Sequence, residues 1–533
     1  YQGMLDLMHP FNSGSGGGVK IGVVPTEEEL DIFENLKLDF RIDSIAPGRD
    51  VYDENTGEIL EPVQVNAARA LEIELINKMG VWKIGPRPPK GSSTKVVRGR
   101  WVDIDKGKFH RSRFVAMEIK GGVKSAFAPE FFAAMPPLSS SKFLCILAVT
   151  SYFPGQEGKL LSIADPSLIF IDVRRAHFVS WARRDIAVEL PAELRKDVDD
   201  LVGVLEKAMY GTRDAPQRWE AFLASELKRH GFVQGIASTC VFVHKDRNLR
   251  CVVHGDDFIF SGTSEDLAWV TERMHESFLI KVVGRLGGDS GDLQEVRVLN
   301  RVLRWTPEGI TYEADPRHVE MLMKDFPVSG GAVKTAGIKG VESDSAEPLE
   351  GSEVRRFRGG AARANYLAQD RPEIAYATKE LCRRMHAPCT GDMKALERLV
   401  KYVASEPRVV YWYVWQEGSP SLNVYCDTDF AGCQITRKST SGGCALMGKH
   451  LVKHWASTQK VVTLSSGEAE LFGVVKGATE ALGLRSLSQD LGVADKLAIN
   501  LHADSSAAIG ICRRTGTGKV RHPVSYTHLR AHE

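Results

Sequence analysis

Two adjacent aspartates stand between two short apolar runs in the segment CVVHGDDFIF, residues 251–260. Apolar, β-prone runs on either side of a Gly-Asp pair are typical of a hairpin with the acids at its tip. Two like charges held side by side repel each other unless a cation lies between them. Asp256 and Asp257 therefore predict a cation site at a hairpin turn. Asp199 and Asp200 lie in a polar, helix-like stretch and instead fit a solvated face.

A third acid lies upstream in the apolar run LIFIDV, residues 168–173, which is predicted to be a buried strand. Asp172 stands near the end of that run. A carboxylate in a buried strand is costly unless it is paired with a cation or fully hydrogen-bonded. Taken alone, this segment leaves both a cation ligand and a hydrogen-bonded turn aspartate open.

A second group of acids follows in the C-terminal part of the chain. Residues 423–511 predict a strand, then a helix that begins at Ser465 or Ser466, and then a further strand followed by a helix. The acids at the ends of these elements are Asp427, Asp429, Glu468, Glu470 and Asp504. For either glutamate alone, the favourable interaction of an acid with the start of a helix is an alternative explanation.

Basic side chains gather in two places. Residues 98–116 predict a hairpin that contains Arg111 and Arg113, a pattern that most often marks a solvated face. In MYGTRDAPQRW, residues 209–219, Asp214 is predicted to cap a helix. Arg213 would then lie near the positive end of that helix, a position that suits phosphate groups.

Composition narrows the classes of protein that the chain can belong to. Its 533 residues predict about three domains, and 69 Lys and Arg against 68 Asp and Glu give a net charge of +1. The nine cysteines form no C-x-x-C pair, which argues against a zinc site or a disulfide framework and favours a reducing compartment. The longest apolar stretch, residues 143–153, is too short to span a bilayer, and no secretory signal is visible.

In order along the chain, these segments resemble the polymerase of copia-like retrotransposons. The similar motifs are RSRFVA (111–116), IDVRRAHF (171–178), MYGTRDAPQRW (209–219), VHGDDFIF (253–260) and ANYLAQDRPEIAYATKELCRRMHAP (364–388). RKSTSGG (437–443) and LSSGEAE (464–470) resemble motifs of the ribonuclease H domain in the same family. The resemblance covers roughly residues 96–522, and several motifs in one order make it specific.

The resemblance implies the reverse transcriptase and ribonuclease H part of a retrotransposon Pol polyprotein. The implied fold is α+β: a right-hand (fingers/palm/thumb) polymerase followed by a connection segment and a ribonuclease H-like α/β domain. The predicted divisions are a poorly ordered linker region (1–95), the polymerase (96–330), the connection segment (331–421), the ribonuclease H-like domain (422–523) and a tail (524–533).

The resemblance also implies two catalytic centres, each with two Mg²⁺ ions or, alternatively, Mn²⁺. In-line attack on a triphosphate needs two cations about 4 Å apart, which carboxylates from two strands can hold. In the polymerase, Asp172 and Asp256 are the expected metal ligands, and Asp257 is expected to point aside as a supporting acid. The expected metal ligands of the ribonuclease H centre are Asp427, Glu470 and Asp504. Asp429 and Glu468 are candidates for supporting these ligands without binding the metal themselves.

The substrate-binding residues implied by the resemblance include three departures from the family pattern. Arg111, Arg113 and Arg213 are candidates for holding the triphosphate. His254 replaces a tyrosine beside the primer strand and could become cationic at mildly acidic pH. Asp214 replaces a glutamine. His177 replaces the aromatic side chain that excludes the sugar 2′-hydroxyl, which puts selection against ribonucleotides in doubt unless Phe178 fills that role.

The implied partners are an RNA template, a DNA primer, the RNA–DNA hybrid and deoxynucleoside triphosphates, with no membrane. The resemblance allows an upstream integrase and protease in the same polyprotein, and a location in cytoplasmic virus-like particles or the nucleus rather than secretion. A decayed remnant that only binds nucleic acid is the alternative. An unrelated phosphohydrolase would explain the paired acids but not the other motifs.

The end of the chain departs from the family pattern, which continues K-H-I-D-I-R-Y-H-F and supplies a fourth carboxylate. Val524 stands at that position here, and a valine cannot coordinate a cation. The string VSYTHLRAHE, residues 524–533, is therefore expected not to be native. The same substitution predicts weak hybrid cleavage and unimpaired primer extension.

Overall fold

The computed structural model describes most of the chain, in two compact units. The described residues are 50–54, 56–107, 109–119, 131–150, 167–195, 200–327, 331–337, 347–417, 421–493 and 497–514. Unit 1 comprises residues 1–133, 174–222 and 277–280, and unit 2 comprises residues 134–173, 223–276 and 281–533. The predicted tail at 524–533 lies outside the described residues. Over the described ranges, no helix has both the length and the apolar character needed to cross a membrane.

Unit 1 is built on a four-stranded sheet, a helix and a separate hairpin. The sheet has the order β1 (Trp82–Pro86), β7 (Leu201–Leu205), β6 (Ile186–Glu189) and β2 (Lys95–Val97), and β2 is parallel to β6. The helix α3 (Pro62–Lys78) packs against the hairpin of β3 (Gly99–Asp105) and β4 (His110–Ala116). The hairpin predicted over residues 98–116 is therefore present.

The prediction of a poorly ordered linker over residues 1–95 is wrong for residues 62–97, which include α3, β1 and β2. The apolar spacing over residues 65–80 favours a helix, and the structure has α3 there. Gly80, with φ +62°, lets the chain turn after this helix. The chain then buries Val81 and Trp82 in the core of unit 1, and the Trp82 indole donates a hydrogen bond of 2.9 Å to the Asn77 side chain. Burial of these side chains outweighs the Gly- and Pro-rich composition of the segment that follows.

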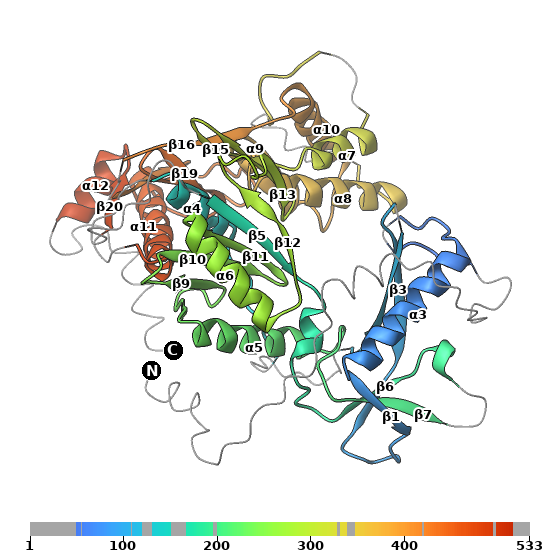
Figure 1. Ribbon diagram of the computed structural model, residues 1–533. Coiled ribbons are helices and arrows are strands. Elements are labelled where there is room, and N and C mark those ends of the chain that lie inside the picture. The colour runs from blue at the N-terminus through green and yellow to red at the C-terminus, as the bar shows by residue number, and fades with distance from the viewer. Residues whose placement is uncertain are drawn as a thin grey trace. The chain divides into compact units, whose positions relative to one another are not determined.

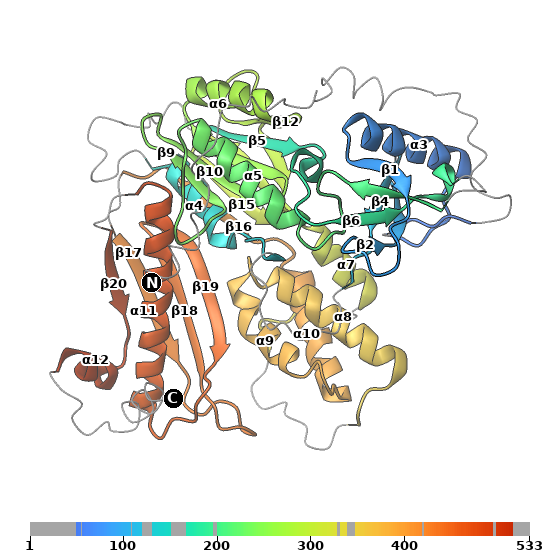
Figure 2. The same cartoon turned by 90° about the horizontal axis from the view of Figure 1, so that it is seen from below.

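Unit 2 contains a six-stranded sheet that positions the first group of acids. Its order is β12 (Ile280–Leu286), β5 (Ser167–Val173), β11 (Asp257–Gly262), β10 (Leu249–His254), β9 (Val241–His244) and β8 (Val233–Gln234). The helix α4 (Leu138–Ala148) packs on β5, β10 and β11, and α6 (Ser264–Ser277) lies on the other side of the sheet (Figures 1 and 2). The helix α5 (Ala215–Arg229) runs from unit 1 into unit 2.

A second sheet and four helices follow in unit 2. The sheet order is β13 (Glu295–Val298), β14 (Arg301–Thr306), β15 (Gly309–Ala314) and β16 (Val410–Val414). The helices α7 (Arg317–Asp325), α8 (Gly351–Leu367), α9 (Pro372–Arg383) and α10 (Thr390–Ser405) lie between β15 and β16 in sequence and share their own core. Residues 371–386 and 392–406 have the apolar spacing of amphipathic helices in the sequence, and the structure has α9 and α10 there.

The C-terminal part of unit 2 has a mixed sheet of order β19 (His450–Thr458), β18 (Thr440–Met447), β17 (Ser421–Thr428) and β20 (Ala498–His502). The strands β17, β18 and β19 are antiparallel, whereas β20 is parallel to β17. The helix α11 (Ser466–Asp490) connects β19 to β20 and lies along the sheet (Figure 2), and α12 (Ser506–Arg513) follows β20. This is the topology of a ribonuclease H-like α/β domain, and the predicted α+β class is confirmed.

One hydrophobic core joins this C-terminal sheet to the six-stranded sheet. Phe143 of α4, Val252 of β10 and Leu484 of α11 belong to the same buried cluster. Polar contacts reinforce the junction: the Asp490 carboxylate accepts hydrogen bonds of 2.9 and 2.8 Å from the amides of Ile236 and Ser238. In addition, the fully buried Arg250 of β10 donates a hydrogen bond of 2.9 Å to the Leu491 carbonyl.

Candidate active sites

The first group of acids lies where β5 ends beside the β10–β11 hairpin. His254 and Asp257 are directly paired, so Gly255 and Asp256 form a two-residue turn. Gly255 has φ +68°, as required at the first central position of a type II′ turn. The hairpin predicted from the sequence is therefore present, with Asp256 in its turn and Asp257 as the first residue of β11.

Asp257 lies opposite Asp172 rather than aside. The two residues are direct partners in the antiparallel pairing of β5 and β11, and residues so paired share one face of a sheet. The Val173 amide donates a hydrogen bond of 2.9 Å to the Asp256 carbonyl, which holds the turn against the end of β5. All three acids predicted for the polymerase centre are thus brought to one place.

The negative charges in this group repel one another. Burial, followed by the charges of Asp256 and Asp172, raises the pKa of Asp257 to about 6. A carboxyl group with a pKa this high is held in a site where a further negative charge is unfavourable. Hard oxygen ligands under mutual repulsion suit a divalent cation such as Mg²⁺, so the donor set fits the expected metal.

The second group of acids meets at the edge of the C-terminal sheet. Among the described residues, Asp427, Glu470 and Asp504 form the one group of three possible ligands whose donor atoms all lie within 4.8 Å of one another. The parallel pairing of Tyr425 with His502 explains this, because each aspartate lies two residues further along its chain. Burial and the charges of Asp427 and Asp504 raise the pKa of Glu470.

The remaining acids of this region stabilise local structure. The Ser465 hydroxyl caps α11 by accepting a hydrogen bond of 3.2 Å from the Glu468 amide, and the Glu468 carboxylate accepts one of 2.8 Å from the Leu464 amide. Asp429 accepts hydrogen bonds of 2.8 and 3.2 Å from the amides of Thr440 and Gly432. Glu468 is therefore engaged in capping the helix that places Glu470.

Two glycines let α11 lie directly on β17. A Cβ at Gly473 would be 2.2 Å from the Thr428 hydroxyl oxygen, and a Cβ at Gly477 would be 2.1 Å from the Cys426 sulfur. Gly473 follows Glu470 by about one helical turn, and Thr428 follows Asp427. This close approach of helix and strand brings Glu470 to Asp427.

Arg111 and Arg113 are part of a basic cluster in unit 1. They alternate with the buried Ser112 and Phe114 on β4 and so share one face of the hairpin. Two further members of the cluster, Arg175 and the buried Glu72, have no local signal in the sequence; they form an ion pair of 2.9 Å. Arg175 has φ +55°, a conformation that its sequence does not indicate.

The electrostatics of this cluster are dominated by Glu72. Burial raises the pKa of Glu72, although Arg175, Arg113 and Arg111 act in the opposite direction. Burial and the neighbouring charges of Arg113 and Arg175 lower the pKa of Arg111. The charges of three guanidinium groups therefore act on one buried carboxylate, which leaves surplus positive charge that suits phosphate groups.

His177 is the more accessible of the two candidates for the sugar-facing position. Phe178 is fully buried in the core of unit 1, whereas His177 is half-buried. The His177 ring lies 4.8 Å from the Tyr210 ring, and the Arg113 guanidinium lies 4.8 Å from the centre of the same Tyr210 ring. His177 thus adjoins the basic cluster.

Asp214 and Arg213 belong to an ion-pair network in unit 1. The Asp214 carboxylate pairs with Arg184, whose guanidinium also donates two hydrogen bonds of 2.8 Å to Glu118. Although burial acts in the opposite direction, hydrogen bonds from Arg184, the Arg213 amide and Lys95 lower the pKa of Glu118 to about 2. Arg184 therefore neutralises Asp214, the anion at the position where the resemblance implies a glutamine. The Arg213 guanidinium lies over the Phe131 ring, 3.9 Å from its centre.

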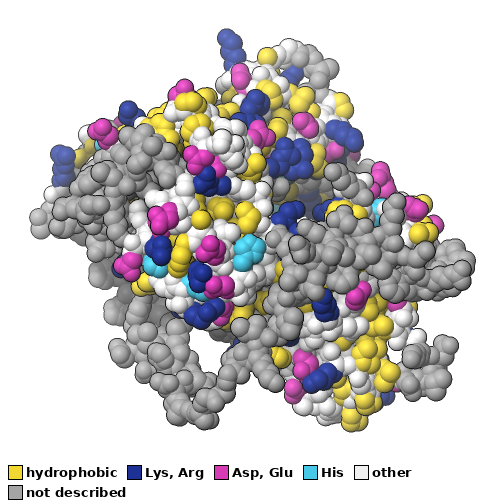
Figure 3. Space-filling view, viewed as in Figure 1, with side chains coloured by type: hydrophobic (Ala, Val, Ile, Leu, Met, Phe, Trp, Pro, Cys, Tyr) yellow, Lys and Arg dark blue, Asp and Glu magenta, His cyan; other side chains and the backbone are white. Residues whose placement is uncertain are grey.

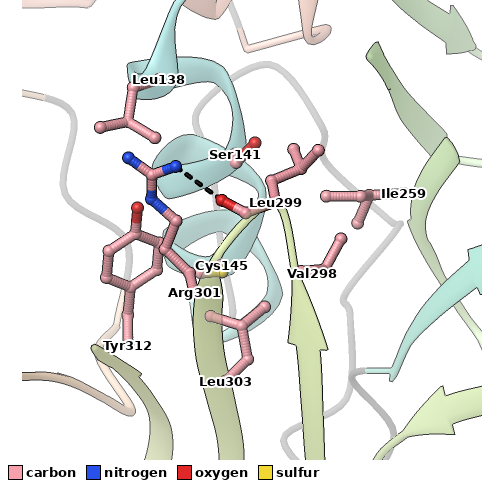
Figure 4. A pocket seen from close by; sticks show the side chains of 9 residues that line it. All are labelled: Leu138, Ser141, Cys145, Ile259, Val298, Leu299, Arg301, Leu303 and Tyr312. Carbon is pink, nitrogen blue, oxygen red and sulfur yellow. Dashed lines mark hydrogen bonds between the residues drawn. The ribbon is translucent and has the colours of Figure 1, made fainter. Parts of the chain in front are cut away.

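A small cavity beside α4 is part of the protein core. It lies between α4, β11 and the sheet of β13, β14 and β15, and Arg301 donates a hydrogen bond of 2.6 Å to the Leu299 carbonyl at its wall (Figure 4). Its volume is about 20 Å³, room for roughly one water molecule. A nucleotide cannot bind there.

The chain is 25% identical over 442 residues to the retrovirus-related Pol polyprotein from transposon RE1 of Arabidopsis thaliana, covering 81% of this chain and 28% of that protein. It is 25% identical over 441 residues to the corresponding polyprotein from transposon RE2 of the same organism, with the same coverage. It thus spans about 28% of the length of these relatives.

Among solved structures, the chain is similar to a foamy viral protease-reverse transcriptase in complex with dsDNA, at 13% identity and a TM-score of 0.47. That alignment covers 94% of this chain and 89% of the other. No protein-family model matches the chain.

Proposed function

Because the chain is a homologue of the retrovirus-related Pol polyproteins of copia-type transposons, we propose that it is an RNA-directed DNA polymerase with a ribonuclease H domain. The observation that carries this proposal is the meeting of two separate groups of three acids. Asp172, Asp256 and Asp257 come together from two strands that are far apart in sequence. Asp427, Glu470 and Asp504 do so again in the C-terminal domain.

In the polymerase centre, Asp172 and Asp256 would hold the metal. Asp257 would act as a supporting acid whose negative charge lies beside these two ligands. Bound Mg²⁺, two ions per centre with Mn²⁺ as the alternative, would activate the attacking hydroxyl and neutralise charge on the phosphates. Positive charge at Arg111 and Arg113 suits the triphosphate of an incoming deoxynucleotide. His177 would limit the space beside its sugar, and His254 would contact the primer strand.

In the ribonuclease H centre, Asp427, Glu470 and Asp504 would hold the metal that cleaves the RNA strand of a hybrid. The bound metal would supply an activated water and stabilise the leaving oxygen. An RNA template, a DNA primer and their hybrid are the proposed macromolecular partners. Virus-like particles in the cytoplasm, or the nucleus, are the proposed location.

Primer extension with Mg²⁺ on an RNA template tests the first activity, and release of labelled RNA from a hybrid tests the second. Incorporation of deoxynucleotides that stops on chelation of the metal is the expected result. A decayed remnant would bind the hybrid tightly and neither extend the primer nor cut the RNA. That outcome would favour the alternative function.

A further inference from the structure

An open pocket rich in arginine lies in unit 2 between the end of α7 and the middle of α8, remote in sequence from both groups of acids. Its volume is about 350 Å³, and it is lined by Asp325, Arg355, Arg356, Gly359, Gly360 and Arg363. Lys and Arg side chains are visible over the region of these helices (Figure 3). Three guanidinium groups face one carboxylate, so the pocket has a surplus of positive charge.

Two of the arginines are held in place by the end of α7. The Arg356 guanidinium donates hydrogen bonds of 3.2 and 3.0 Å to the Asp325 carbonyl and lies 4.6 Å from the centre of the Phe326 ring. Arg363 forms an ion pair with the Asp325 carboxylate. Arg355, one helical turn before Gly359, is exposed. Two positioned guanidinium groups and one accessible group thus converge on the pocket.

The two glycines of α8 have different roles. A Cβ at Gly360 would be 2.6 Å from the Phe326 ring, so Gly360 allows α8 to pack against α7. A Cβ at Gly359 would meet nothing within 4 Å. Packing within the chain therefore does not require a glycine at position 359, although glycine is a poor helix former. Its absent side chain leaves the floor of the pocket open between Arg355 and Arg363.

We infer that this pocket binds the phosphate groups of a nucleic-acid backbone, an inference that rests on the proposed function. Guanidinium groups pair with phosphate oxygens in a forked geometry, and the bare helix surface at Gly359 lets a bulky backbone approach them. The chain as a whole is nearly neutral, with a net charge of +1, so its affinity for a polyanion must come from local clusters of this kind.

Filling the pocket floor tests the inference without weakening the fold. Gly359→Leu adds a side chain where the structure has open space and replaces a poor helix former with a good one. We expect unchanged or higher thermal stability but weaker binding of an RNA–DNA hybrid. The slope of log affinity against log salt should fall by the amount that corresponds to the loss of about one to two phosphate contacts. Gly483→Leu is the matched control, because Gly483 is an exposed glycine of α11 whose Cβ would also meet nothing within 4 Å. It should leave hybrid binding unchanged.

Charge is tested separately at the accessible arginine. Arg355→Gln should lower the slope of log affinity against log salt by about 1, and Arg355→Lys should retain it. Wild-type affinity and slope in both Gly359→Leu and Arg355→Gln would overturn the inference, while primer extension by the wild-type chain would leave the proposed function standing. If Arg355→Gln instead weakens binding of inorganic tripolyphosphate but not of the hybrid, the pocket serves free polyphosphates and the assignment to a backbone is wrong.

Discussion

The carboxyl group of Asp257 makes the stability of the metal-free protein depend on pH. Its pKa is raised from 3.8 to about 6 in the folded protein, so the folded state binds this proton more tightly than the unfolded chain does. The stabilisation is complete below about pH 4 and is lost as the pH rises through 6. Asp257→Asn should therefore raise the free energy of unfolding at pH 7 by about 1 kcal/mol, after allowance for solvent screening.

Thermal unfolding in a chelator at pH 4.5 and pH 7 measures this effect. The gain from Asp257→Asn should be larger at pH 7 than at pH 4.5. A variant that is less stable than wild type at pH 7 would contradict the opposition of charges between Asp257 and its neighbours.

Single substitutions should separate the two activities. Asp256→Asn keeps the shape of the side chain but removes an anionic metal ligand, so extension should fall by at least about 10²-fold, the scale of losing a charge-stabilising group. Hybrid affinity, which rests on Lys and Arg contacts, should change little. Glu470→Gln should abolish RNA cleavage and spare extension. Extension by Asp256→Asn near the wild-type rate would show that Asp256 is no ligand.

His177 should set the selection between deoxy- and ribonucleotides. His177→Phe places a larger, apolar ring beside Tyr210 and should raise discrimination against ribonucleotides by about 10-fold or more. The ratio of incorporation rates for a matched pair of nucleotides measures it. Equal ratios before and after the change would remove His177 from this role, and Phe178 is too buried to replace it.

At this scale the sequence predicted which acids meet but not how they face one another. Adjacent acids in an apolar hairpin indicated Asp256 and Asp257 because burying paired charges is costly without a compensating cation. The position of Asp257 opposite Asp172 depends on the register of two strands that are distant in sequence. The partner of Asp214, which is Arg184, was likewise invisible because an ion pair across the fold leaves no local pattern.

Among the elements, the contact of α11 with β17 determines whether Glu470 reaches Asp427. Gly473→Ala introduces a Cβ 2.2 Å from the Thr428 hydroxyl oxygen, so the helix must move away from the strand. We expect a loss of about 1–3 kcal/mol in stability from overpacking. Hybrid cleavage should fall by up to about 10²-fold, as a displacement near 1 Å can produce, while primer extension is retained.

Gly483→Ala in the same helix is the control, because its Cβ would meet open space. It should be neutral or stabilising and should leave cleavage at the wild-type rate. Unimpaired cleavage by Gly473→Ala would mean that the helix position does not limit the site.

Helices and hairpins with a regular spacing of apolar residues were predictable from the sequence. Short strands that pair with strands distant in sequence were not. The amphipathic helices α9 and α10 and the acid hairpin follow from apolar spacing. The strands β1 and β2 have five and three residues, and most of the β1 side chains are exposed, so their sequences carry little alternation. Their pairing with β7 and β6 comes from the assembly of unit 1 and is a tertiary effect.

For the whole molecule, the compact units do not follow the predicted order of consecutive domains. The C-terminal sheet and the six-stranded sheet share one core, in which Phe143, Val252 and Leu484 all take part. A chain that ends at residue 417 would expose the apolar side of α4 that this core covers. We therefore expect the truncated protein to aggregate or to lose primer extension.

Soluble yield and thermal unfolding of the truncated and full chains measure this dependence. The double substitution Asp427→Asn, Glu470→Gln serves as the control, because it removes the second site but keeps the C-terminal domain. A truncated chain that is as stable and as active in extension as the full chain would show that the shared core is dispensable.

The 25-residue helix α11 has one further consequence. Near its first turn lies Glu470, and at its other end Asp490 and Leu491 are fastened to the loop before β9 and to β10, the strand that leads into the Asp256 turn. A straight helix of this length spans about 37 Å and changes little in length. In a chain with the two activities proposed above, this helix would hold the two groups of acids at a constant separation along one template.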